Sequence, residues 1–174
     1  MLDKKRIQEA ENNLKSYLEQ ELIKKQQFKG IIYQTYIRNH HESLILAEKI
    51  FNENLSSLWA VVISYYSMFY IANAVIYKLG YKIGGKISHK ITADALIVYV
   101  KDKLKNNIIE NYEKESAEAL ALSNNLIESF DFERIKRSRF QYETTEVIKR
   151  SKAKTSLERA KEFSFEMKKL LFKS

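Results

Sequence analysis

The chain has 174 residues, a formal net charge of +8 at pH 7, no cysteine, no proline and only four glycines. The absence of cysteine excludes disulfides, thiolate zinc sites and cysteine nucleophiles. So few helix breakers, together with abundant Leu, Ile, Lys and Glu, favour an all-α domain. The N-terminal sequence MLDKKRIQEAENNLK has no apolar segment like that of a signal peptide, which predicts a cytoplasmic protein.

Apolar residues at helical spacing predict the first two helices. A stripe from Ile7 to Leu22 predicts a helix over residues 3–27, whose other face carries Lys and Glu. Gly30 interrupts this pattern, so we expect the second helix over residues 31–52.

The next segment, residues 55–77, contains no charged residue and is long enough to cross a bilayer. It also contains serines, an asparagine and several tyrosines, which would be poorly placed in mid-membrane. A helix that is apolar on nearly all sides is instead the central member of a bundle, so we expect no membrane contact. Asn54 or Ser56 would cap it. Its tyrosine hydroxyls would need partners, which indicates a polar cleft beside the core.

Three more helices are predicted after the glycine-lysine loop YKIGGKIS. They cover residues 89–104, 107–130 and 151–172, and Ser88 is the expected N-cap of the first. Residues 131–147 have no clear period and are expected to form an exposed connection.

Together these elements predict an all-α, antiparallel up-and-down bundle of four to five helices with an extra N-terminal helix. We expect a single domain over residues 1–174. Within it, residues 1–35 would form the helical extension and residues 36–174 the bundle.

The excess positive charge lies entirely in the C-terminal part of the chain. Residues 1–133 contain 17 basic and 17 acidic residues, whereas residues 134–174 contain 13 basic and 5 acidic ones. Such asymmetry is typical of a surface that binds a polyanion, and it also fits a solvated basic helix.

Common catalytic and metal-binding motifs are missing. The sequence has no Walker or Rossmann phosphate loop, no HExxH and no GxSxG. The adjacent residues His40 and His41 would point about 100° apart on a helix, so we expect a surface pair and not a shared metal ion. We therefore predict no metal and no cofactor.

Two segments resemble the HEPN family of helical nucleotide-binding domains. One is the helix SYYSMFYIANAVIYKLG with the lysine loop and the helix start SHKITADAL after it; the other is RIKRSRFQY, followed by LERAKEF in the last helix. The resemblance covers about residues 40–172. It implies a homodimeric bundle, often paired with a small nucleotidyltransferase in toxin–antitoxin or related defence systems.

The resemblance also implies a ribonuclease motif, in which a histidine follows an arginine by four to six residues where two subunits meet. No arginine of this chain has a histidine at that spacing, and the nearest counterpart is Arg137 with Tyr142. A phenol with an ordinary pKa near 10 is a poor general base at neutral pH. The candidate catalytic residues of a divergent enzyme are Arg137 and His89, with His41 as an alternative base.

A first candidate binding site lies in the basic connection. Arg134, Arg137 and Arg139 offer planar guanidinium groups to phosphate, and Phe140 and Tyr142 offer rings on which a base could stack. Alternatively, the phenylalanine is core and the arginines pair with neighbouring glutamates at the surface.

A second candidate site contains Lys82, Lys86, His89 and Lys90. Amides at a helix start carry partial positive charge, so a phosphate could sit beside His89 and Lys90 while the loop lysines close over it. Alternatively, His89 is hydrogen-bonded to a tyrosine hydroxyl.

Three functions stay open at this point. The first is a HEPN-like module that binds a nucleotide, RNA or a nucleotidyltransferase partner. The second is a divergent, metal-independent endoribonuclease that acts as a dimer. The third is a purely structural helical interaction protein, because the apolar stripe of the N-terminal helix must be covered by something.

Overall fold

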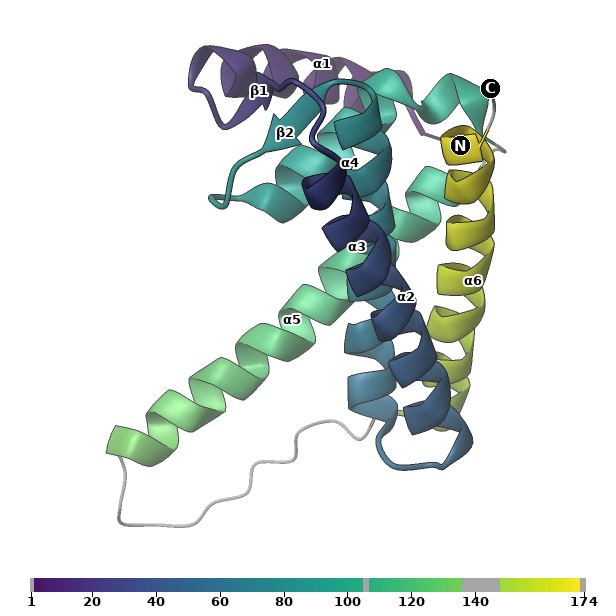
Figure 1. The fold of residues 1–174 in the computed structure, drawn as a ribbon. Helices are drawn as coiled ribbons and strands as arrows, with labels where there is room; N and C mark the ends of the chain where they lie inside the picture. Colours follow the sequence, from purple (N-terminus) through teal and green to yellow (C-terminus); the bar gives the residue numbers. More distant parts are fainter. Residues whose placement is uncertain (1, 105–106, 136–147, 173–174) are drawn as a thin grey trace.

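The computed structural model describes residues 2–104, 107–135 and 148–172, and for residues 125–135 it describes the backbone alone. Six α-helices and one two-stranded sheet make up this part of the chain (Figure 1), so the all-α prediction is confirmed. The elements in chain order are α1 Lys4–Glu19, β1 Ile23–Lys25, α2 Gly30–Asn52, α3 Ser57–Lys78, β2 Tyr81–Ile83, α4 Ser88–Tyr99, the 3₁₀ turn η1 Lys101–Lys103, α5 Ile108–Ile135 and α6 Arg150–Phe172.

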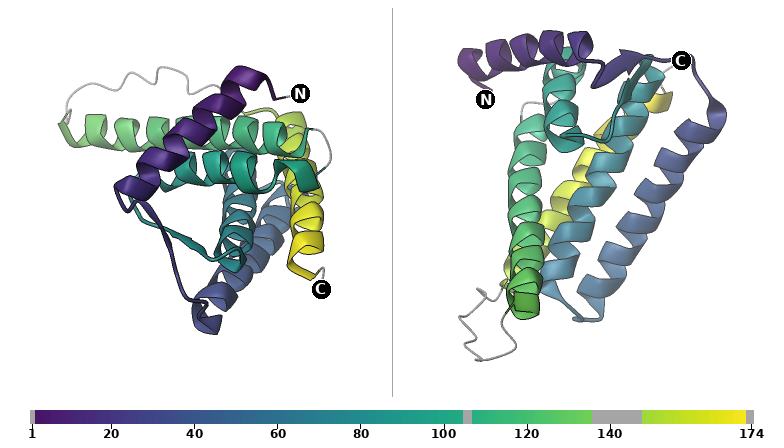
Figure 2. Two further views of the ribbon diagram at one scale, coloured as in Figure 1. Left: turned by 90° about the horizontal axis from the view of Figure 1, so that it is seen from above. Right: turned by 90° about the vertical axis from the view of Figure 1, so that its left-hand side faces the viewer.

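Helix α3 is the centre of the bundle. Ser56 caps it by accepting a hydrogen bond from the Trp59 amide at 3.2 Å, which confirms one of the two predicted caps. α3 packs against α2 and α6, and also against α4 and α5 (Figure 2). It is the one described helix that is long and apolar enough to cross a membrane, yet 72% of its most apolar window is buried inside the bundle. The segment therefore has the surroundings of a core helix, as predicted.

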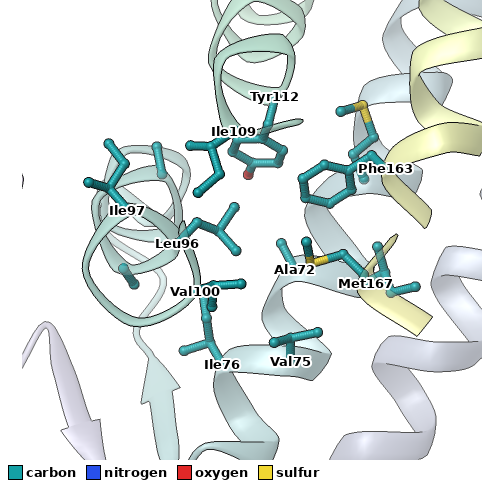
Figure 3. Packing of buried hydrophobic residues seen from close by; sticks show 14 of the residues in the cluster. Ala72, Val75, Ile76, Leu96, Ile97, Val100, Ile109, Tyr112, Phe163 and Met167 are labelled. Atoms are coloured by element: carbon teal, nitrogen blue, oxygen red, sulfur yellow. The ribbon is translucent and has the colours of Figure 1, made fainter. Parts of the chain in front are cut away.

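The core lies where α3, α4, α5 and α6 meet. Tyr112 of α5 is fully buried and stacks on Phe163 of α6, with ring centroids 5.1 Å apart (Figure 3). Leu96 of α4, Ala72 of α3 and Met167 of α6 close the space around these rings (Figure 3). Burial of a side chain such as Leu96 or Phe163 contributes about 1.5–3 kcal/mol to the stability of the fold. Burial of Leu96 in this cluster therefore helps to hold α4 over α3.

Helix α1 lies across one end of the bundle and covers α4 (Figures 1 and 2). An ion pair joins it to its neighbours, because Arg6 contacts both Asp94 of α4 and Glu113 of α5. The apolar stripe of α1 is thus covered by the same chain. The stripe residues that become buried are Ala10, Leu14 and Tyr17.

The small antiparallel sheet was not predicted. The first helix ends at Glu19 and not at residue 27, because the chain after it pairs with β2, the strand that follows α3. Ile23 lies opposite Ile83 and both side chains are buried. The predicted helix over residues 3–27 was therefore wrong in its last part. Ile23 is buried by strand pairing and not by a continuation of the helix.

Two other helix bounds differ from the prediction. α4 begins at Ser88, which was expected to be its N-cap, and it ends at Tyr99 and not at residue 104. α5 continues to Ile135, beyond the expected end at residue 130. Apolar residues continue through both C-terminal ends, so their spacing alone does not mark where the helices stop.

Candidate anion-binding site

Two glycines shape the entry to the loop between β2 and α4. Gly80 adopts φ +92°, a left-handed conformation that turns the chain from α3 into β2. The Gly84 amide donates to the carbonyl of Leu22 at 2.8 Å, and a Cβ on Gly84 would lie 3.2 Å from that oxygen. The loop of residues 84–87 is therefore held close to the chain that leads into β1, while its own residues are exposed.

Lysines gather on the sheet and on the loop that follows it. Lys24 of β1 lies directly opposite Lys82 of β2, and like charges at such positions repel each other. Lys86 and Lys90 follow at intervals of four residues, so successive Cα atoms are at most about 14 Å apart. None of these four side chains forms an ion pair within the described chain. We refer to Lys24, Lys82, Lys86 and Lys90 as the lysine surface.

Helix α4 begins without a capping side chain. Ile87 occupies the N-cap position with φ +44°, in the left-handed region that β-branched residues rarely adopt. Its side chain is 54% exposed, so burial does not account for this strained conformation. The first amides of α4 therefore have no side-chain acceptor and carry the partial positive charge of a helix start. Such amides suit a phosphate oxygen.

A chain of hydrogen bonds orients His89 beside this helix start. Ser116 Oγ of α5 donates to Tyr65 Oη of α3 at 2.9 Å, and Tyr65 Oη lies 2.6 Å from His89 Nδ1. The imidazole also packs against Phe69, with ring centroids 4.4 Å apart. The predicted bond between His89 and a tyrosine hydroxyl is thus observed, and it places a polar chain beside the core.

Burial sets the protonation of this chain. It raises the pKa of Tyr65 to about 12, so the phenol keeps its proton at neutral pH. Burial also lowers the pKa of His89 below its ordinary value of 6.5. A neutral imidazole therefore lies next in sequence to the cationic Lys90.

Most of the other predicted cluster lies outside the described residues. Arg137, Arg139 and Tyr142 lie outside the described residues, as does Phe140. Arg134 belongs to α5, 18 residues after Ser116, which corresponds to about 27 Å along the helix axis. Figure 1 shows this end of α5 extending away from the other helices. Within one chain, Arg134 and His89 therefore do not share a site.

Many basic residues of α6 join helices to one another. Glu115 of α5 is 1% exposed and accepts from Arg159 Nη1 at 2.7 Å and from Ser156 Oγ at 2.5 Å. Five of the seven basic residues of α6 thus pair with carboxylates of α2, α5 and α6. The remaining ion pairs of this helix are Lys152–Glu118, Lys154–Glu158, Lys161–Glu48 and Lys169–Glu166.

The prediction of an exposed histidine pair was wrong for one member. His41 is exposed, but His40 is only 1% exposed, because neighbouring helix positions point about 100° apart and α2 turns His40 onto α3. His40 Nδ1 lies 2.9 Å from Ser67 Oγ, and Nε2 is buried without a partner. Desolvation lowers the pKa of His40 to about 4. His40 is therefore a neutral core residue at physiological pH.

A separate cavity of about 360 Å³ lies where α3, α4 and α6 end. Lys78 Nζ donates to the carbonyl of Leu171 near the end of α6. Helix C-termini carry partial negative charge, so Lys78 stabilises the end of α6. The cavity is lined by Val75, Lys78, Leu79, Val100, Lys103, Leu170 and Leu171.

Sequence reasoning missed two members of the site. Lys24 joins the lysine surface only through pairing of two three-residue strands that are far apart in the chain. Ser116 lies in α5, and the apolar pattern of that helix gives no sign that one of its serines bonds to Tyr65. The need of buried tyrosines for partners was a usable signal for Tyr65, but it did not indicate which residue of α5 would supply the partner.

No group of three His, Asp or Glu side chains in the described ranges is arranged to hold a metal ion. Comparisons with protein-family models, with curated proteins and with solved structures find no match to this chain. Function therefore has to be inferred from the geometry of the lysine surface, the start of α4 and His89.

Proposed function

We propose that this chain is a HEPN-like helical module that binds RNA phosphates through the lysine surface and the start of α4. The observation that carries the proposal is the position of Lys24 opposite Lys82, two like charges without a carboxylate partner in the described chain. Lys86 and Lys90 add two more cations beside helix amides that lack a side-chain cap. A polyphosphate chain supplies the negative charge that this arrangement lacks.

The resemblance of residues 40–172 to HEPN proteins supports a ligand of this class. It rests in part on the lysine loop and on the helix start SHK, the segments that carry Lys82, Lys86 and Lys90 of the lysine surface. The proposal is binding without chemistry, because the ribonuclease motif is missing and His89 is far from Arg134 along α5.

Replacing Lys82, Lys86 and Lys90 by alanine should weaken binding of a labelled single-stranded RNA at least about tenfold at moderate salt. Each phosphate contact that is lost lowers the slope of log affinity against log salt by about 0.7, so the slope should fall by about 2. Fluorescence anisotropy at several salt concentrations measures both quantities.

The matched control replaces three exposed lysines elsewhere, Lys49, Lys114 and Lys168, by alanine. Both triple variants lower the net charge from +8 to +5. A general electrostatic attraction would make the two variants equal, and that result would contradict a local site. We expect the control to keep the wild-type salt slope.

A homodimer and a nucleotidyltransferase partner belong to the same proposal. Leu55 and Trp59 support contact with another chain, because they lie just before α3 and in its first turn and are 64% and 49% exposed. We expect sedimentation velocity to show a dimer at micromolar concentration and a monomer for Trp59→Glu. A wild-type protein that sediments as a monomer would contradict the dimer.

A further inference from the structure

His89 has one ring nitrogen engaged and one open. Nδ1 is occupied by Tyr65 Oη, whereas Nε2 forms no hydrogen bond within the described part of the chain. The buried polar atoms that lack a partner do not include Nε2, so this atom is reachable from solvent. A ligand that forms a hydrogen bond to the ring of His89 therefore has to do so at Nε2.

The hydrogen-bond chain favours one of the two neutral tautomers of His89. Ser116 donates to Tyr65 Oη, and the phenol keeps its own proton, which it can donate to His89 Nδ1. A neutral imidazole that accepts at Nδ1 carries its proton on Nε2. Packing against Phe69 holds the ring in this orientation. The open edge of His89 thus presents an N–H donor.

We propose that His89 binds an RNA phosphate through Nε2–H, and that the Ser116–Tyr65 chain sets this tautomer and lets His89 take up a proton when RNA binds. This inference rests on the proposed RNA-binding function and adds a pH dependence to it. The proton comes from solvent, and the imidazolium then donates to phosphate from Nε2 and to Tyr65 from Nδ1.

Tyr112 makes the second state possible. In the imidazolium, Nδ1 of His89 donates to Tyr65 Oη. The hydroxyl proton of Tyr65 then has to point to a different acceptor. The hydroxyl of Tyr112 is buried beside the hydroxyl of Tyr65, and a side-chain hydrogen bond between the two contributes to the pKa shifts of both tyrosines. Tyr112 therefore offers an oxygen to which Tyr65 can turn its proton.

Two cations and three tyrosines surround His89, and the cations disfavour its protonation until an anion is bound. Tyr65 and Tyr66 face it from α3, Tyr112 stands behind Tyr65 on α5, and Lys86 and Lys90 flank it in the chain. Within the described residues, no carboxylate counteracts the lowering of the His89 pKa, which is due to burial. A bound phosphate would be the first anion at this imidazole, and an anion favours its charged form.

NMR of the histidine ring nitrogens tests the tautomer without any ligand. Wild-type protein at pH 7.5 should show His89 protonated on Nε2, and Tyr65→Phe should shift it towards a mixture. Tyr66→Phe is the matched control, because its ring touches His89 without a hydrogen bond. A wild-type His89 protonated on Nδ1, or a Tyr65→Phe variant identical to the control, would overturn the inference.

RNA binding against pH tests the coupling. If bound oligouridylate raises the pKa of His89 by one unit, its affinity should rise about tenfold as pH falls through the two values. His89→Gln keeps a donor that does not titrate, so it should bind at pH 8 within about threefold of wild type and lose the pH dependence. His41→Gln should retain it.

The outcomes separate the two proposals. Oligouridylate binding by wild type and His89→Gln with the same pH dependence would overturn the inference and leave the RNA-binding function standing. No binding by wild type would overturn the RNA-binding function and the coupling with it, while the NMR result would still report the tautomer.

Discussion

Replacing Asp94 by alanine should lower the free energy of unfolding by about 3 kcal/mol and release α1 from α4. Asp94 is fully buried, and its Oδ1 lies 2.6 Å from Arg6 Nη2. Its Oδ2 accepts from Asn13 at 3.1 Å and from Tyr17 at 3.2 Å. Removal of the carboxylate leaves three donors of α1 without this acceptor, and such loss in a buried site is costly.

Chemical unfolding and hydrogen exchange measure this effect. We expect exchange protection to fall most in α1, because the lost bonds all join α1 to α4. Asp102→Ala is the control, since that side chain is 86% exposed and should change stability by less than about 0.5 kcal/mol. Equal stability of the two variants would show that the Asp94 contacts do not hold α1.

A double variant separates the cost of burying the Arg6–Asp94 ion pair from the cost of removing only one of its partners. Arg6→Met with Asp94→Leu replaces the central ion pair by apolar groups, which is often neutral or stabilising in buried sites. We expect the double variant to be more stable than Asp94→Ala, because it leaves no guanidinium beside the site of the lost carboxylate.

Acid should destabilise the fold through His40 by about 3 kcal/mol in total. Desolvation, together with the charge of Lys168, lowers the pKa of His40 to about 4, whereas the unfolded chain has the ordinary value of 6.5. Between these values the unfolded state binds a proton that the native state does not. Stability is therefore full above pH 6.5, falls as pH decreases towards 4, and loses about 2 kcal/mol of this contribution by pH 5.

Urea unfolding of wild type and His40→Gln at pH 7.5 and pH 5 isolates this contribution. Other groups, including His89, titrate in both proteins, so the difference between their pH dependences reports His40. We expect the dependence of His40→Gln to be flatter by about 2 kcal/mol. His41→Gln should follow wild type, because His41 is exposed. Identical curves for wild type and His40→Gln would contradict a buried neutral histidine.

The long apolar helices were predictable because each carries its own signal. α3 combines a long uncharged run with a serine cap, and its burial follows from the lack of any polar side. α1, α2 and α6 have apolar stripes at helical spacing, which places them around a common core. For the site, the bond between His89 and a tyrosine followed as an alternative from the rule that buried hydroxyls need partners.

The remaining features depend on contacts that no local pattern records. Three-residue strands are too short to show alternation, so Lys24 could not be placed opposite Lys82 from the sequence. Asp94 lies within an apolar helix, and its burial depends on Arg6 being 88 residues away in the chain and adjacent in space. His40 and His41 are neighbours in α2, and only His40 faces the core. Which of the two faces inwards depends on how α2 packs against α3.

The most direct test of the RNA-binding site is an NMR titration of the backbone amides with oligouridylate at low salt. We expect the largest shifts in residues 84–90 and around Lys24, while amides of α6 change little. Shifts confined to α6, or no shifts at RNA concentrations that saturate other RNA-binding modules, would contradict it.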